Sequence, residues 1–229
     1  MFFYYDSYYL LLVLPAILLS LFAQMKVKST YKKYAEVSSA RGITAREVVE
    51  KVLAQNGVSG VRIERVAGEL TDHYDPRTNV IRLSDSVYGS ASVASLGVAA
   101  HEAGHAVQYA KGYLPIKLRN TVLPAANLGS TLSVPLVLLG FILGAPALVT
   151  FGILLFSLVL LFQVITLPVE FNASRRALLA LEDGNLLHGE ELTGAKKVLS
   201  AAALTYVAAV LTSLAQLLRL VLLSRRRNR

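Results

Sequence analysis

The chain has 229 residues, of which 54% are hydrophobic and only 17% are charged, and its formal net charge is +8. Average globular chains have about 45–50% apolar and about 25% charged residues, so these proportions indicate membrane spans beside a modest polar domain. The absence of cysteine excludes disulfides, thiolate metal ligands and cysteine nucleophiles. Because cytoplasmic loops of membrane proteins collect Lys and Arg, the positive charge calls for no nucleic-acid partner.

The first apolar segment covers residues 8–25 and contains no charged residue. About 18 such residues are the lower limit for a helix that crosses ~30 Å of hydrocarbon. No Lys or Arg precedes the segment, whereas four lysines lie between residues 26 and 33, so the positive-inside rule places the N-terminus outside. We expect residues 1–25 to form an uncleaved anchor whose outer aromatic belt consists of Tyr4, Tyr5, Tyr8 and Tyr9.

The polar part of the chain, residues 26–122, mixes the patterns of helices and strands. Thr44 followed by Glu47 is a capping box that begins a helix, and Asn56-Gly57 ends it. The pattern therefore predicts a small α+β domain. Its further expected elements are short strands at 61–66 and 79–84, a turn-rich stretch between them at 71–78, and a buried helix rich in Ala and Val at 91–110.

Three more apolar stretches follow the polar part. Residues 123–143 and 146–167 flank Gly144-Ala145-Pro146, a turn that suits a helical hairpin, and residues 198–223 form the last stretch. Basic residues within 169–197 support placing this segment on the same side as the polar domain. Four spans would return the arginine-rich tail to the outside, which conflicts with the same rule and leaves its side open.

The sequence therefore predicts a mainly α, multi-pass protein of the cell membrane. A small α+β domain is expected in its polar part. The predicted parts are an N-terminal anchor (1–25), the α+β domain (26–122), a transmembrane hairpin (123–168), a helix and loop (169–197), and a C-terminal transmembrane helix with its basic tail (198–229).

The stretch from His101 to His105 reads His-Glu-Ala-Gly-His, an HExxH motif. On a helix the two histidines share one face, so both imidazoles can bind one Zn²⁺ at about 2.0–2.1 Å. The carboxylate of Glu102 can take a proton from a water that zinc activates and deliver it to the leaving amine. A chance motif on an amphipathic helix is the alternative, but buried polar groups are costly without a partner such as a metal. We predict one zinc ion per chain.

Zinc needs a third protein ligand. A metzincin would continue the motif as HExxHxxGxxH, but Gln108 and Lys111 occupy those positions. A glutamate from a downstream helix is the remaining common solution, and Glu170 is the best candidate because a lone acid after an apolar span is costly unless it is hydrated or bound. The other interpretation makes Glu170 an N-terminal helix carboxylate that follows Pro168 and is favoured by the helix dipole.

Most of the chain resembles the YugP-type membrane zinc metallopeptidases. The segments that carry the resemblance, besides the first span, are LTDHYDPRTNVIRLSDSVY, VAAHEAGHAVQYAKGYLPIKLRN, TLPVEFNASRRAL and GAKKVLSAAALTYVAAVL. The pairing of HExxH with EFxAS is more distantly similar to the HtpX-type membrane proteases, whose second motif reads ExxxD.

The resemblance implies that residues 26–122 form a zincin-like catalytic domain built around the HExxH helix. Its gluzincin-type site has His101, His105 and Glu170, from segment 169–197, as the zinc ligands, and Glu102 as the catalytic acid and base. Ser174 stands where the HtpX-type proteases have an aspartate next to the metal ligands. The resemblance therefore leaves open which residue orients the ligands here.

Other features have two interpretations each. His73 can support an oxyanion or a substrate, or it is a turn residue with local hydrogen bonds. Tyr206 can donate to an oxyanion, or it is a core or interfacial aromatic. The strand at 79–84 is expected to hold an extended substrate along its edge, unless the strand pair only covers the helix. Arg219 is expected to snorkel towards the membrane surface.

Two functions fit these observations. The first is a membrane-embedded zinc endopeptidase that faces the cytoplasm and cleaves membrane or membrane-proximal polypeptides, in quality control or processing. The alternative is a non-proteolytic membrane scaffold that zinc stabilises; structural zinc usually has four protein ligands, so three favour the enzyme. The expected partners are polypeptide substrates and the lipid bilayer, whereas an oligomer or a membrane partner cannot be read from the sequence.

Overall fold

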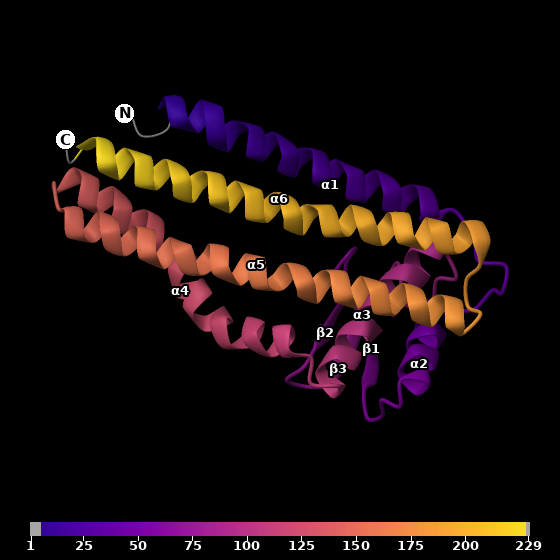
Figure 1. Ribbon diagram of the computed structural model, residues 1–229. Helices are drawn as coiled ribbons and strands as arrows, with labels where there is room; N and C mark the ends of the chain where they lie inside the picture. The colour runs from indigo at the N-terminus through magenta and orange to yellow at the C-terminus, as the bar shows by residue number, and fades with distance from the viewer. Residues whose placement is uncertain (1–5, 228–229) are drawn as a thin grey trace. The chain divides into compact units, whose positions relative to one another are not determined.

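The computed structural model describes residues 6–227, which form a mainly helical protein with one small three-stranded sheet (Figure 1). The mainly α class that the composition predicts is confirmed. Four of the residues singled out above, Tyr4 and Tyr5 of the aromatic belt and Asn228 and Arg229 of the tail, lie outside the described residues.

Among the described residues, four helices are long and apolar enough to cross a membrane, as the apolar stretches predict. α5 and α6 have 38 and 39 residues, which at 1.5 Å per residue is nearly twice the ~30 Å of hydrocarbon. A single helix can therefore contain a span and also continue into a polar domain. The four are α1 (Leu14–Ala35, entered through the π-helical turn η1, Tyr9–Val13), α4 (Leu114–Ile142), α5 (Pro146–Asp183) and α6 (Gly189–Arg227).

The described residues divide into two compact units. The helical unit consists of residues 6–24, 117–168 and 204–227, and the mixed unit consists of residues 25–116 and 169–203. α5 and α6 therefore contribute to both units, and the expected metal ligands all belong to the mixed unit.

In the helical unit, α4 and α5 are joined by the short turn that the sequence predicts. Gly144 has φ +64°, a left-handed conformation that side chains rarely adopt, and its backbone lets the chain reverse. Pro146 then occupies the first position of α5, where a missing N–H costs no helical hydrogen bond.

Arg219 of α6 is buried, so the expectation that it snorkels is wrong. Its Nε and Nη2 atoms donate to Asp6 Oδ2 over 2.9 and 2.7 Å, and its guanidinium lies 5.2 Å from the ring centroid of Tyr9. The carboxylate and the ring hold the cation inside the unit. Because Asp6 precedes α1 and Arg219 is near the end of α6, these two helix ends lie together, as an even number of crossings requires.

In the mixed unit, α2 (Ala45–Gln55) begins with the capping box that the sequence predicts. The Thr44 hydroxyl accepts the Glu47 N–H over 3.3 Å, and the Thr44 N–H donates to the Glu47 carboxylate over 2.7 Å. The helix ends at Gln55 with Asn56 as its C-cap, and Gly57 follows with φ +66°. Both ends of α2 were therefore readable from local chemistry.

The sheet has three strands, β1 (Arg62–Val66), β2 (His73–Asp75) and β3 (Val80–Ser84), in the order β1-β3-β2. β1 pairs with β3 in parallel and β2 pairs with β3 antiparallel. The sequence predicts two of these strands but not β2. This strand forms within the stretch expected to be turn-rich, and it is too short to show an alternating pattern. β1 pairs along one edge of β3, and β2 pairs with residues 80–82 on the other edge. Because both edges are occupied there, the expectation that a substrate lies along the edge of this strand is wrong.

α3 (Val93–Ala110) is the buried helix that the sequence predicts. Ser92 caps it by accepting the N–H of Ser95 over 3.2 Å. α3 packs against α2 and the sheet, beside the strands in Figure 1, and its small side chains leave room for close contact. Residues from α2, β3, α3 and α5 form the shared core, among them Val48, Val49, Leu83, Leu96, Ala103 and Leu181.

Candidate metal centre

The two histidines of the HExxH motif lie on one face of α3. Their rings meet edge to face with centroids 4.7 Å apart, and the side chains of His101 and His105 are only 15% and 12% exposed. The helical spacing of four residues therefore places two imidazoles side by side in a nearly buried site.

Glu170 completes the group from the interior of α5. Its Oε2 atom lies 3.3 Å from His101 Nε2 and 3.6 Å from His105 Nε2, and its side chain is 5% exposed. α5 runs without a break from Pro146 to Asp183, so Glu170 is no helix N-terminal carboxylate and that interpretation is wrong. The structure instead brings together the three residues that the sequence argument proposed as ligands.

A glycine between the two histidines allows α3 and α5 to approach closely. A Cβ atom added to Gly104 would lie 2.8 Å from the backbone oxygen of Ala173, closer than real Cβ contacts. Ala173 is one turn after Glu170 on α5. The absence of a side chain at residue 104 is therefore what lets the carboxylate reach the histidines.

The three side chains fit a zinc ion. Their ligand atoms all lie within 4.8 Å of one another. Ligands at about 2.1 Å in tetrahedral geometry lie about 3.4 Å apart, and the two nitrogen–oxygen distances of 3.3 and 3.6 Å agree with this spacing. A divalent cation would also offset the cost of burying the Glu170 carboxylate between two imidazoles.

Each histidine has a hydrogen-bond partner on the ring nitrogen that faces away from Glu170. His101 Nδ1 lies 3.1 Å from Ser174 Oγ, and His105 Nδ1 lies 3.0 Å from Gln108 Oε1. Ser174 thus takes the place in space that its position in the motif suggests. The sequence argument did not predict this contact of Gln108 with His105. The available signal was a polar residue one turn after His105 on a helix expected to be buried.

The neighbouring carboxylates change the pKa of the second histidine, His105. Burial lowers the pKa of His105, but the hydrogen bond that its imidazole donates to Glu170 and the negative charges of Glu102 and Glu170 outweigh this effect, so the pKa lies above its ordinary value. Zinc binds neutral imidazole, so metal binding competes with protonation of this site. Glu102 itself is 8% exposed and adjoins His101 on α3.

The two further candidates lie outside this group. His73 is an exposed residue at the start of β2, and its Nδ1 atom lies 2.8 Å from the Thr71 carbonyl oxygen, a local contact of the kind that the non-functional interpretation requires. Tyr206 is 37% exposed and belongs to the part of α6 in the helical unit.

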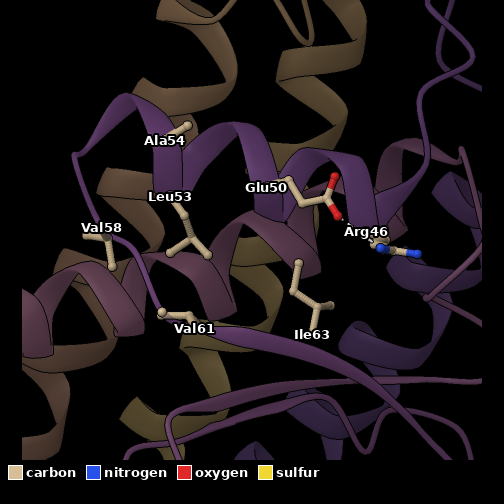
Figure 2. A pocket seen from close by; sticks show the side chains of 8 residues that line it. Arg46, Glu50, Leu53, Ala54, Val58, Val61 and Ile63 are labelled. Carbon is tan, nitrogen blue, oxygen red and sulfur yellow. Dashed lines mark hydrogen bonds and ion pairs between the residues drawn. The ribbon is translucent and has the colours of Figure 1, made fainter.

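A separate hollow of about 370 Å³ lies between α2 and β1, and Figure 2 shows the side chains that line it. Leu53, Val61 and Ile63 form its apolar side, and the ion pair between Arg46 and Glu50, 3.1 Å long, lies at its rim. None of the three candidate metal ligands lines this hollow.

Comparison with known proteins agrees with the site. Residues 9–225 match the model of a family described as "Putative neutral zinc metallopeptidase". The chain belongs to this family. It is also 46% identical over 215 residues to "Putative membrane protease YugP" of Bacillus subtilis (strain 168). The aligned residues cover 94% of the chain and 96% of that relative. No solved structure matches the chain. The chain is therefore a zinc-peptidase family member, and several of its described helices are long and apolar enough to span a membrane.

Proposed function

We propose that the protein is a membrane-embedded zinc endopeptidase in which His101, His105 and Glu170 hold one zinc ion and Glu102 is the general base. The observation that carries the proposal is the grouping of two imidazole nitrogens and one carboxylate oxygen within 4.8 Å of one another. Three protein ligands leave a coordination position for water or substrate, as catalytic zinc sites do. The gluzincin assignment rests on the same ligand set.

When bound, zinc supplies Lewis-acid chemistry that polarises a carbonyl and makes water a nucleophile at neutral pH. The residues of the chain provide the rest. Glu102 takes the proton of the attacking water and then donates it to the nitrogen of the leaving amine as the peptide bond breaks. Ser174 and Gln108 hold the imidazoles of the two histidines in orientation.

The scaffold alternative is less well supported. A structural zinc site usually has four protein ligands, whereas the group found among the described residues contains three. A scaffold also gives no reason for a nearly buried carboxylate, that of Glu102, next to the first histidine.

We further propose that the substrates are membrane or membrane-proximal polypeptides, and that the protein works in their quality control or processing. The mixed unit is continuous with α5 and α6, which also contribute to the helical unit, so the site is tied to the membrane. The orientation of the first span favours a site on the cytoplasmic side.

The experiment compares Glu102→Gln with the wild type, using purified zinc-loaded protein in detergent and fluorescein-labelled casein as an unfolded substrate. The amide has the size of the carboxylate but cannot take a proton, so we expect full zinc content and a loss of hydrolysis of about 10²–10⁴-fold. Glu69→Gln, the same change at an exposed residue, is the control. Wild-type turnover in Glu102→Gln would refute the proposed role.

A further inference from the structure

Gln108 is a fully buried polar side chain whose amide joins α3 to α5. Its Nε2 atom donates to the Val169 carbonyl oxygen over 2.8 Å and to Asn172 Oδ1 over 3.0 Å. Its Oε1 atom lies 3.0 Å from His105 Nδ1. One side chain therefore contacts a candidate metal ligand on α3 and both sides of Glu170 on α5.

The direction of these hydrogen bonds is fixed by two groups, one of which can only donate and the other only accept. The Arg176 guanidinium only donates, and its Nε lies 2.8 Å from Asn172 Oδ1, so the oxygen of that amide accepts. The Val169 carbonyl oxygen also only accepts. The Gln108 NH₂ group must therefore face Val169 and Asn172, which turns its oxygen towards His105.

The orientation of the Gln108 amide decides which nitrogen of His105 carries the proton. An amide oxygen only accepts, so His105 Nδ1 must donate a proton to it. The neutral imidazole then has its lone pair on Nε2, which lies 3.6 Å from Glu170 Oε2, at the metal side of the ring. The Ser174 hydroxyl beside His101 can donate or accept, so it imposes no such choice.

We propose that Gln108 is a positioning residue that fixes His105 as the Nδ1–H tautomer and holds the Glu170 turn of α5 against α3. The proposal rests on the proposed metal site. Hydrogen-bond partners of zinc-bound histidines commonly contribute 10–100-fold to metal affinity. In this chain the partner acts on two ligands, because Val169 and Asn172 flank Glu170.

The first measurement uses the wild-type protein labelled with ¹⁵N-histidine and loaded with zinc. The chain has only four histidines, so the NMR signals can be assigned by single substitutions. We expect the His105 Nδ1–H proton to be present and protected from solvent exchange. An unprotonated Nδ1 in a zinc-loaded protein would overturn the proposal while leaving zinc binding itself intact.

The second measurement compares zinc dissociation constants by chelator competition. Gln108→Met keeps the length of the side chain without its hydrogen bonds, and we expect a 10–100-fold weaker affinity and loss of the Nδ1–H protection. Gln108→Glu keeps an acceptor for His105 but has no donor for α5, so protection is expected to remain while zinc binding weakens less than in Gln108→Met. Gln55→Met, at an exposed glutamine of α2, is the matched control.

Equal zinc affinity of Gln108→Met and Gln55→Met, within twofold, would overturn the positioning role. Retained Nδ1–H protection in Gln108→Met would overturn the tautomer argument, since a purely structural glutamine would change stability without changing that signal. A wild-type protein that binds no zinc would instead refute the metal site on which the proposal rests. The wild-type NMR experiment tests the proposal even where a variant does not fold.

Discussion

Replacing Gly104 by alanine tests whether the close approach of α3 and α5 builds the metal centre. The added Cβ would lie 2.8 Å from the Ala173 oxygen, about 0.6 Å short of the 3.4 Å at which ordinary contact begins. The obstacle is backbone, which no rotamer change can move away. One of the two helices must therefore shift by about that distance.

A shift of this size is large for a metal site, where ligand distances are held to within about 0.2 Å. The displaced turn of α5 carries Glu170 as well as Ala173. We expect zinc affinity to fall about 10–100-fold, the range seen when the support of a ligand is lost. Overpacking costs about 1–3 kcal/mol, and the better helix propensity of alanine offsets about 1 kcal/mol of it.

The assay is zinc affinity by chelator competition, together with thermal unfolding of the metal-free protein. Gly97→Ala is the matched control on the same helix, because its Cβ would meet the Ala195 Cβ at an ordinary 3.4 Å. We expect this control to bind zinc as the wild type does and to be equally or slightly more stable. Wild-type zinc affinity in Gly104→Ala would show that the contact does not position Glu170.

Three further predictions concern the ligands, the topology and the helical unit. His105→Ala should lose stoichiometric zinc by elemental analysis, because two remaining ligands do not hold the ion; full zinc in this variant would contradict the ligand assignment. In intact cells, Ser7→Cys should react with a membrane-impermeant maleimide and Ser38→Cys should not; both positions are exposed, and the reverse pattern would place the site outside. Asp6→Ala removes the carboxylate that pairs with buried Arg219 and should destabilise the protein by about 3–5 kcal/mol in thermal unfolding, whereas unchanged stability would mean that the pair contributes little.

Much of this protein could be predicted from local chemistry in the sequence. The four apolar stretches, the capping box at Thr44 and the turn at Gly144 all depend on residues close together in the chain. The same holds for the histidine pair, because helical spacing alone puts His101 and His105 on one face. These features need no knowledge of what packs against them.

The tertiary structure decided what lies at long range. Glu170 is 69 residues from His101, and only the packing of α5 on α3 brings its carboxylate to 3.3 Å. The sequence allowed a helix to begin near Pro168, but α5 continues through this proline, and Val169 and Glu170 directly after it are buried. Pairing on both edges likewise made β3 the central strand, an outcome that depends on β2, which is too short to leave a pattern.

The difference between local sequence signals and long-range packing also explains why the roles of Gln108 and Gly104 could not be predicted. In the sequence, one is a residue that rules out a metzincin and the other an unspecified position of the HExxH motif. Their roles depend on the backbone of α5, through the Val169 oxygen for one and the Ala173 oxygen for the other. The sequence by itself determined which side chains can bind the metal, whereas the contact between two helices decided how those side chains are held, because that contact joins residues more than 60 positions apart.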